Sequence, residues 1–251
     1  MENVLKNRIE KMYEGECIDI LVIRKALDLI KAGKIRAAEK QNGKWIVNAW
    51  VKQAILLAFK HFEPQKQEFN AFDKFSLLPY MGGYRKVPGA IIRDYVHISD
   101  GAVIMPSCIN IGTYIGTKTM IDINAVVGSC AQIGANCHIS AQACIGGVLE
   151  PTVAMPTIIE DNCFIGSHSA ILDGVIVGEN SVIAAGTIIT SSTRIIDRKT
   201  GNVMYGEIPA GSVVVPGSYE SNNCNINCAV VIKQATSEVL SKTSINELLR
   251  S

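Results

Sequence analysis

The sequence predicts a mainly β fold, a parallel β-helix of hexapeptide repeats, with a small α+β domain before it. Between Val103 and Ile195 an aliphatic residue recurs at every sixth position, in two series. The position four residues after each aliphatic is mostly Ser, Thr, Ala or Cys, and Leu149 is the one large exception. A period of six matches neither an α-helix nor an alternating strand, and it is typical of short rungs stacked into coils.

The repeating aliphatic side chains are expected to point into the prism, where each packs on its counterpart in the next coil. The first series is Val103, Ile109, Ile115, Ile121, Val127, Ile133, Ile139 and Ile145, and the second is Ile159, Ile165, Ile171, Val177, Ile183, Ile189 and Ile195. If three rungs make one coil, these 15 rungs form about five coils, or a prism roughly 24 Å long at about 4.8 Å per strand. The general preference for right-handed connections predicts right-handed coils.

A loop is predicted where the two series fall out of phase. Ile145 and Ile159 are 14 residues apart, where two rungs would need 12. The segment between them contains two glycines together with Pro151 and Pro156. We therefore expect residues 146–158 to form a loop that projects from the wall, and loops on a rigid scaffold often carry function.

The remaining chain divides around this repeat. Residues 1–62 predict an α+β domain with two helices up to about residue 32, a hairpin at Asn42-Gly43 and a third helix. A domain of this size has a small core, so we expect it to pack on the β-helix or on a neighbouring subunit. Residues 63–90 form a connector, residues 91–205 the β-helix, and residues 206–251 strands and a short final helix with Ser244 as its N-cap.

Composition limits the classes of function. The chain has 251 residues, 48% of them hydrophobic, and a net charge of +1, which argues against nucleic acid or an acidic membrane surface as a main partner. No apolar run is long enough for a membrane span or a signal peptide, so we expect a cytoplasmic protein. Cys137 and Cys163 fall in the small inward position, where reduced buried thiols are expected. No spacing predicts a metal site or a tightly bound cofactor.

Two charged residues are the main candidates for chemistry. Asp122 directly follows an inward aliphatic, where neighbouring rungs carry Asn, Gly or Ser. A carboxylate there projects outward and can bind an ammonium group or accept a proton, although a surface aspartate without a role fits the pattern equally well. Arg85 lies in the connector, and the residues alone favour a solvated loop position for it. The histidines are scattered, and His168 is of interest because it follows the interruption.

Longer motifs resemble the tetrahydrodipicolinate N-succinyltransferase family over essentially the whole chain. The matching segments are GKIRAAEKQNGKWIVNAWVKQAILLAF (33–59), VGSCAQIG (127–134), IGGVLEP (145–151), PTIIEDNCFIG (156–166), STRIIDRKTG (192–201), YGEIPAGSVVV (205–215) and INELLR (245–250). The resemblance implies a left-handed coil and a homotrimer with active sites between adjacent subunits. It also implies transfer of a succinyl group from succinyl-CoA to ring-opened tetrahydrodipicolinate, in bacterial lysine and diaminopimelate biosynthesis.

The resemblance assigns roles to individual residues. It implies that Arg85 clamps a substrate carboxylate and that Asp122 binds and orients the acceptor amine. By the same match, Ser167 and His168 contact the acceptor. The CoA-contacting residues are expected to be Gly186, Arg194, Arg198, Lys199 and Lys233. The implied reaction is direct attack of the amine on the thioester, because two positioned substrates need no covalent intermediate.

The sequence departs from the family at the predicted site. Asn124 replaces an aromatic residue, His168 replaces an arginine, and Ala170 replaces a glutamate to which an active-site role is often assigned. His168 or Asp173 are the candidates for the missing base. These changes keep two other functions open: a related transferase that uses a different donor such as acetyl-CoA, and a non-catalytic or sugar-binding β-helix.

Overall fold

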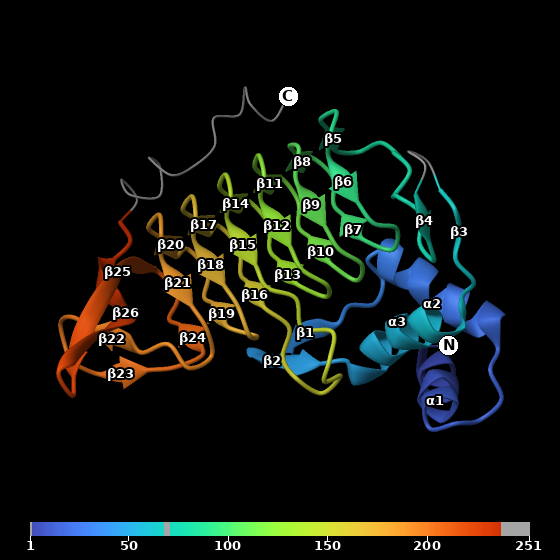
Figure 1. The fold of residues 1–251 in the computed structure, drawn as a ribbon, viewed down its shortest axis with the longest axis horizontal. Helices are drawn as coiled ribbons and strands as arrows, with labels where there is room; N and C mark the ends of the chain where they lie inside the picture. Colours follow the sequence, from blue (N-terminus) through green and yellow to red (C-terminus); the bar gives the residue numbers. More distant parts are fainter. Residues whose placement is uncertain (1, 68–70, 237–251) are drawn as a thin grey trace.

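The computed structural model describes residues 2–67 and 71–236. Three helices, α1 (Glu2–Tyr13), α2 (Ile20–Lys31) and α3 (Ala49–His61), share one apolar core at one end of the molecule (Figure 1). Asp19 caps α2 by accepting from the backbone N–H groups of Leu21 and Val22. The predicted hairpin is confirmed: β1 (Ala38–Gln41) pairs with β2 (Lys44–Val47) across Asn42 and Gly43.

The predicted β-helix is also confirmed, as three stacks of parallel strands that we call faces A, B and C (Figure 1). Face A contains β7 (His97–Ile98), β10 (Tyr114–Ile115), β13 (Gln132–Ile133), β16 (Ile158–Ile159), β19 (Ile176–Val177) and β24 (Glu207–Ile208). Face B contains β5 (Arg85–Lys86), β8 (Val103–Ile104), β11 (Met120–Ile121), β14 (His138–Ile139), β17 (Phe164–Ile165), β20 (Val182–Ile183) and β25 (Ser212–Ser221). Face C contains β6 (Ile91–Ile92), β9 (Cys108–Ile109), β12 (Val126–Val127), β15 (Cys144–Ile145), β18 (Ala170–Ile171) and β21 (Ile188–Ile189).

Two-residue strands explain the period of six. In each strand of the central coils the first side chain points outward and the second enters the core, so that Ile121 pairs with Ile139 and Ile139 with Ile165. The inward aliphatic residues and the small residues of the turns, such as Cys137 and Ala143, are fully buried in one continuous core. Stacked apolar burial of this kind is what holds neighbouring coils together.

The assignment of Val103 to the inward series is wrong. Ile104 pairs with Ile121 and belongs to the core, whereas Val103 packs outside it with Met120 and Met105. The step from Ile104 to Ile121 is 17 residues, whereas Ile121 to Ile139 is 18. Because the rung from Ile104 to Ile109 has five residues and not six, a strict period of six cannot be extended back past Ile109.

The predicted loop at residues 146–158 lies between β15 and β16, and it returns to the helices rather than projecting away. Leu149 packs against the core of α1, α2 and α3, and Lys52 of α3 donates a hydrogen bond from Nζ to the carbonyl oxygen of Ala154 at 2.6 Å. The same core includes Ile111 and Cys130, which lie in the turns between faces C and A. The helices are therefore packed on the β-helix, as the small size of their core predicted.

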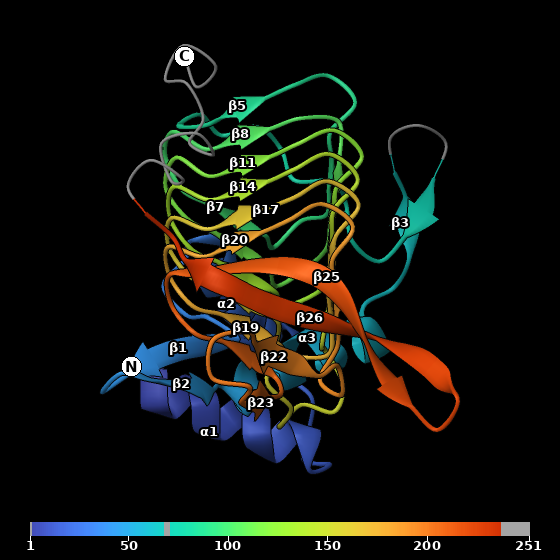
Figure 2. The same cartoon turned by 90° about the vertical axis from the view of Figure 1, so that its left-hand side faces the viewer.

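Antiparallel strands complete the other end of the prism. β22 (Ile195–Asp197) pairs with β23 (Val203–Met204), after which β24 rejoins face A. β25 then forms a long hairpin with β26 (Cys224–Gln234), which crosses this end of the prism (Figure 2). A short pair, β3 (Gln65–Lys66) and β4 (Phe72–Asp73), precedes the coils. The predicted final helix at Ser244 lies outside the described residues.

None of the helices in the described part of the chain combines the length and the apolar composition that crossing a bilayer requires.

Candidate active site

Asp122 lies on the edge of the prism where face B turns into face C. We call this the Asp122 edge, and it consists of the stacked turns 122–125, 140–143, 166–169 and 184–187. The same place in each turn is held by a residue with positive φ: Asn124, Gln142, His168 and Gly186. Each of the last three donates its backbone N–H to a carbonyl of the turn before it, which fixes the spacing of the stack.

Two neighbouring groups contact the Asp122 carboxylate. Its Oδ1 accepts a hydrogen bond from the backbone N–H of Ile123 at 2.7 Å, and its Oδ2 lies 3.4 Å from Nε2 of His138. The side chains of Asp122 and His138 are 28% and 21% exposed, respectively. The carboxylate is therefore held in place but still open to a ligand that approaches from solvent.

Arg85 lies on face B, below Asp122 along the axis of the prism. It pairs with Val103 in the next coil, and Val103 pairs with Met120, two residues before Asp122. Two strand steps of about 4.8 Å separate the two positions by roughly 10 Å along the axis. The structure thus places the two residues expected to bind the acceptor on one face and its adjoining edge.

A large cavity opens at the turn between β5 and β6, two coils below Asp122. It has a volume of about 1070 Å³ and is lined by connector residues 66, 67, 71, 73 and 75–80, and by residues 86–91 and 93, next to Arg85. Within its lining, Arg93 is paired with Asp73 at 2.6 Å. The cavity gives an extended ligand room beside Arg85.

The other predicted residues fall into two groups. Ser167, His168 and Gly186 all lie on the Asp122 edge, in the second and third turns above Asp122. Ala170 begins β18 on face C, one residue beyond that edge. Asp173 lies instead in the turn between faces C and A, on the opposite side of face C from Asp122.

The four predicted CoA-binding cations gather at the β22–β26 end of the prism. Arg198 and Lys199 are in the turn after β22, and Lys233 is on β26, paired with Val213. Arg194 stacks its guanidinium on the ring of Tyr219, 4.2 Å from its centroid. Gly186 lies between this end and Asp122, and a Cβ atom added at Gly186 would meet no atom within 4 Å.

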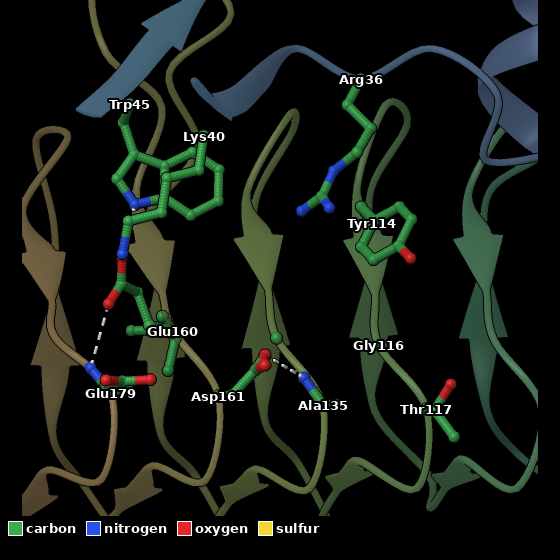
Figure 3. Close-up of a pocket in the computed structure, with 12 residues that line it drawn as sticks. Arg36, Lys40, Trp45, Tyr114, Gly116, Thr117, Ala135, Glu160, Asp161 and Glu179 are labelled. Carbon is green, nitrogen blue, oxygen red and sulfur yellow. Dashed lines mark hydrogen bonds and ion pairs between the residues drawn. The ribbon is translucent and has the colours of Figure 1, made fainter. Parts of the chain in front are cut away.

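A second cavity, of about 450 Å³, lies between the β1–β2 hairpin and face A (Figure 3). Its wall includes Arg36, whose guanidinium lies over the ring of Tyr114 at 3.6 Å from the centroid. Arg36 Nε also donates to Oε1 of Gln132 at 2.8 Å, and Gln132 is fully buried. Arg36 thus links the N-terminal domain to face A of the β-helix.

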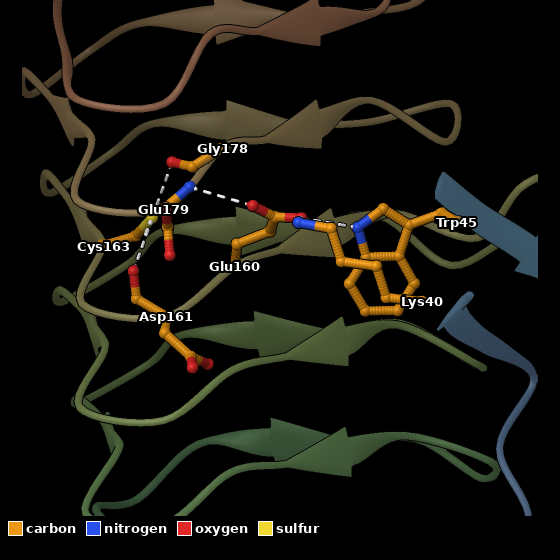
Figure 4. Close-up of polar contacts among 7 residues, drawn as sticks. All are labelled: Lys40, Trp45, Glu160, Asp161, Cys163, Gly178 and Glu179. Carbon is orange, nitrogen blue, oxygen red and sulfur yellow. Dashed lines mark hydrogen bonds and ion pairs between the residues drawn. The ribbon is translucent and has the colours of Figure 1, made fainter. Parts of the chain in front are cut away.

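Glu160 is the centre of the polar contacts in this cavity (Figure 4). Its carboxylate accepts from Lys40 Nζ at 2.6 Å, from Trp45 Nε1 at 2.7 Å and from the backbone N–H of Glu179 at 3.1 Å. Burial raises the pKa of Glu160, but the hydrogen bonds from Lys40 and Trp45 outweigh it and the pKa lies below its ordinary value. The sequence reasoning missed this residue, although Glu160 directly follows inward Ile159 just as Asp122 follows inward Ile121.

Three family models match the chain. The N-terminal model of tetrahydrodipicolinate N-succinyltransferase matches residues 4–61, a bacterial transferase hexapeptide model matches residues 112–147, and the hexapeptide repeat of succinyl-transferase matches residues 156–191.

Similar curated proteins cover nearly the whole chain. A protein from Wolbachia sp. subsp. Brugia malayi, named 2,3,4,5-tetrahydropyridine-2,6-dicarboxylate N-succinyltransferase, is 47% identical to this chain. The alignment covers 92% of this chain and 89% of that protein. The protein of this name from Cereibacter sphaeroides is 49% identical over 91% of this chain and 88% of its own length. The protein of this name from Dechloromonas aromatica is 42% identical over 100% of this chain and 97% of its own length. This chain belongs to the tetrahydrodipicolinate N-succinyltransferase family.

A solved structure supports the fold of the family. A Campylobacter jejuni protein described as a 2,3,4,5-tetrahydropyridine-2-carboxylate N-succinyltransferase aligns with a TM-score of 0.56 at 16% identity, over 86% of this chain and 63% of its own. The fold is a left-handed parallel β-helix, so the right-handed coil predicted from the general connection rule is wrong. That rule concerns twisted strands joined by long crossovers, whereas these two-residue strands are joined by short turns with positive-φ residues.

Proposed function

We propose that this protein transfers the succinyl group of succinyl-CoA to the amino group of ring-opened tetrahydrodipicolinate. The observation that supports this most directly is the placement of Arg85 and Asp122 on one face and its edge, about two strand steps apart. Arg85 binds the distant carboxylate of the acceptor, and Asp122 binds its amine.

The length of the acceptor fits this placement. The ring-opened compound is a seven-carbon dicarboxylate, and its far carboxylate lies roughly 8 Å from the amine nitrogen when the chain is extended. The Cα positions differ by roughly 10 Å along the prism, and the long side chain of Arg85 can adjust for the remainder. A guanidinium holds a carboxylate through two parallel hydrogen bonds, so binding at Arg85 also fixes the orientation of the acceptor.

The reaction requires positioning more than covalent chemistry. The carboxylate of Asp122, held by Ile123 N–H, orients the amine toward the thioester carbonyl. Placing two substrates in attacking geometry lowers the barrier by several kcal/mol, up to about 10. Backbone N–H groups of the neighbouring turns are the donors for the negative charge that develops on the carbonyl oxygen.

CoA runs along the Asp122 edge toward the β22–β26 end of the prism. The open space in front of Gly186 leaves room for the narrow pantetheine chain close to the wall. Ser167 and His168 lie between Gly186 and Asp122, beside the path of the acyl group. Arg194, Arg198, Lys199 and Lys233 then neutralise the phosphates of CoA.

The protein acts as a homotrimer in the cytoplasm, with active sites between adjacent subunits. The outward column of face C supports association, because it exposes a ladder of apolar side chains. These are Ile91, Val126 and Ile188, which are 49%, 46% and 58% exposed. Exposed large apolar side chains repeated along one face are typical of a surface that is covered in an assembly.

Release of free thiol from succinyl-CoA tests the proposal. The parent protein and Asp122→Ala are each assayed with the tetrahydrodipicolinate acceptor, and acetyl-CoA is the comparison donor. Turnover of succinyl-CoA by the parent, reduced at least 100-fold in Asp122→Ala, supports the proposal. A parent that prefers acetyl-CoA would have a different donor, and a trimeric parent that turns over neither donor would be no transferase of this kind.

A further inference from the structure

His138 lies directly beside the carboxylate that binds the amine, although the sequence motifs gave it no role. It begins β14, one coil above Met120 on face B, and its side chain points outward in the same column. Its Nε2 is 3.4 Å from Asp122 Oδ2. The edge of its ring packs on Phe164, with 5.2 Å between ring centroids and an interplanar angle of 86°.

Asp122 Oδ2 and His138 Nε2 lie 3.4 Å apart, so a ligand nitrogen placed beside the pair can contact both atoms. At the ordinary hydrogen-bond distance of about 2.9 Å from each atom, such a nitrogen forms an isosceles triangle with them. Both side chains are partly exposed, so an ammonium group can reach this point from solvent.

We propose that His138 is the catalytic base of this transferase: the acceptor nitrogen bridges Asp122 Oδ2 and His138 Nε2, and Nε2 takes its proton. The assignment rests on the function proposed above. An imidazole titrates closer to neutral pH than a carboxylate and is therefore the better proton acceptor there. The Asp122 carboxylate first pairs with the ammonium group of the acceptor, and after proton transfer it stabilises the positive charge on the His138 imidazolium.

The other candidate bases fit this role less well. Ala170 has no proton-accepting group, and Asp173 lies on the far side of face C. His168 is in the turn two coils above Asp122, roughly 10 Å along the axis. Among the candidates named, His138 is the one that the fold places within hydrogen-bonding reach of the Asp122 carboxylate.

The proton balance involves two transfers. The bound ammonium loses one N–H proton to Nε2, which releases it to solvent and leaves a neutral amine. The amine attacks the thioester carbonyl, and Nε2 takes the second proton as the C–N bond forms. The C–S bond then breaks, and the imidazolium returns that proton to the leaving sulfur, giving the amide, free CoA thiol and one proton released overall.

The test compares the parent with His138→Gln, which keeps an amide donor near Asp122 but cannot accept the proton. The expected result is a fall in kcat of about 100-fold or more, with the acceptor KM within about threefold and an unchanged melting temperature. Phe164→Leu is the control for packing around the ring and should keep kcat within about threefold. In His138→Gly, added imidazole should restore part of kcat.

Each outcome decides between two possibilities. A His138→Gln protein with near-parental kcat, or with a change confined to KM, overturns the assignment of the base but leaves the proposed function intact. The same holds if His138→Gly stays inactive in imidazole while it remains folded and still binds succinyl-CoA. If the parent itself does not turn over succinyl-CoA and the acceptor, the function fails and the assignment fails with it.

Discussion

Nζ of Lys52 lies 2.6 Å from the carbonyl oxygen of Ala154, and this hydrogen bond joins α3 to the loop at residues 146–158. Lys52 is fully buried, and burial lowers its pKa below the ordinary value of 10.5. The contact therefore anchors the loop, but it keeps an ammonium group away from water, which opposes folding.

Lys52→Met should leave the melting temperature unchanged or raise it, because the variant buries no charge. Amide hydrogen exchange in residues 149–156 should become at least 10-fold faster, because the anchor is lost. Lys60→Met, an exposed position on the same helix, is the control and should change neither quantity. A variant that unfolds much more easily while the loop keeps its protection would contradict this account.

The lowered pKa of Lys52 also predicts a dependence on pH. The unfolded chain binds the Lys52 proton more tightly than the folded chain, so the destabilisation is fully present below the folded pKa. It disappears as the pH rises toward 10.5, the ordinary value. The unfolding free energy of the parent relative to Lys52→Met should therefore increase between neutral pH and about pH 10, measured by urea denaturation.

Glu160→Gln should weaken the attachment of the β1–β2 hairpin to face A. The change removes a charge that accepts from Lys40 and Trp45, and we expect the unfolding free energy to fall by about 1–3 kcal/mol. Calorimetry should show a melting temperature lower by roughly 2–8 °C. Glu179→Gln is the control, because Glu179 contributes its backbone N–H to Glu160 and its own side chain is exposed.

The difference in unfolding free energy between the parent and Glu160→Gln should also increase with pH, as it does for Lys52, but in the acid range. Because the pKa of Glu160 is lowered by folding, its contribution is present above the ordinary value of 4.5 and is lost as the pH falls through the folded value. The unfolding free energies of the parent and Glu160→Gln should therefore become equal in acid. A difference that stays constant down to pH 3 would show that the Glu160 charge is not responsible.

Arg85→Gln should raise the KM for the acceptor by about 10- to 150-fold, which corresponds to the loss of about 1.5–3 kcal/mol from a charged hydrogen-bonded pair. The acceptor KM of Arg85→Lys should lie between those of the parent and Arg85→Gln, because an ammonium keeps the charge but not the paired hydrogen bonds of a guanidinium. The KM for succinyl-CoA serves as the internal control. Equal increases in both constants would place Arg85 outside the acceptor site.

Ile188→Asp should disrupt the proposed trimer through the apolar column of face C. Ile188 is 58% exposed in the single chain, and a carboxylate buried there without a partner is strongly destabilising to the assembly. Light scattering coupled to size exclusion should show a lower mass and reduced turnover. Val203→Asp, at a residue 45% exposed on β23, is the matched control and should stay trimeric.

The fold was predictable from sequence to the extent that it repeats. Ile121, Ile139 and Ile165 stack one above another because each occupies the same place in its coil, and a stacked position has to be apolar in every coil. Val103 was misplaced because one missing residue between Ile104 and Ile109 shifts the phase, and both Val103 and Ile104 are buried aliphatics. Local pattern cannot decide between two such neighbours.

The site was less predictable, because it depends on which distant residues meet. Asp122 and Glu160 follow their inward aliphatics in the same way, yet one turns to an open edge and the other is covered by Trp45 and Lys40 of the hairpin. The proximity of His138 to Asp122 follows from strand register, since His138 pairs with Met120. Without the register, a histidine 16 residues away gives no reason to connect the two.

If Arg85 and Asp122 bind the acceptor as proposed, the stacking of Arg85, Val103 and Met120 on face B sets the length of acceptor that fits. The gap between the carboxylate clamp and the amine holder is a whole number of coils, and each coil adds about 4.8 Å. Duplicating the coil that contains β8 would therefore shift the preferred acceptor toward longer dicarboxylates. Standard bond lengths convert one added coil into about four methylene groups. Chain-length selectivity in this scaffold would then change in discrete increments, by counting repeats and not by reshaping a pocket.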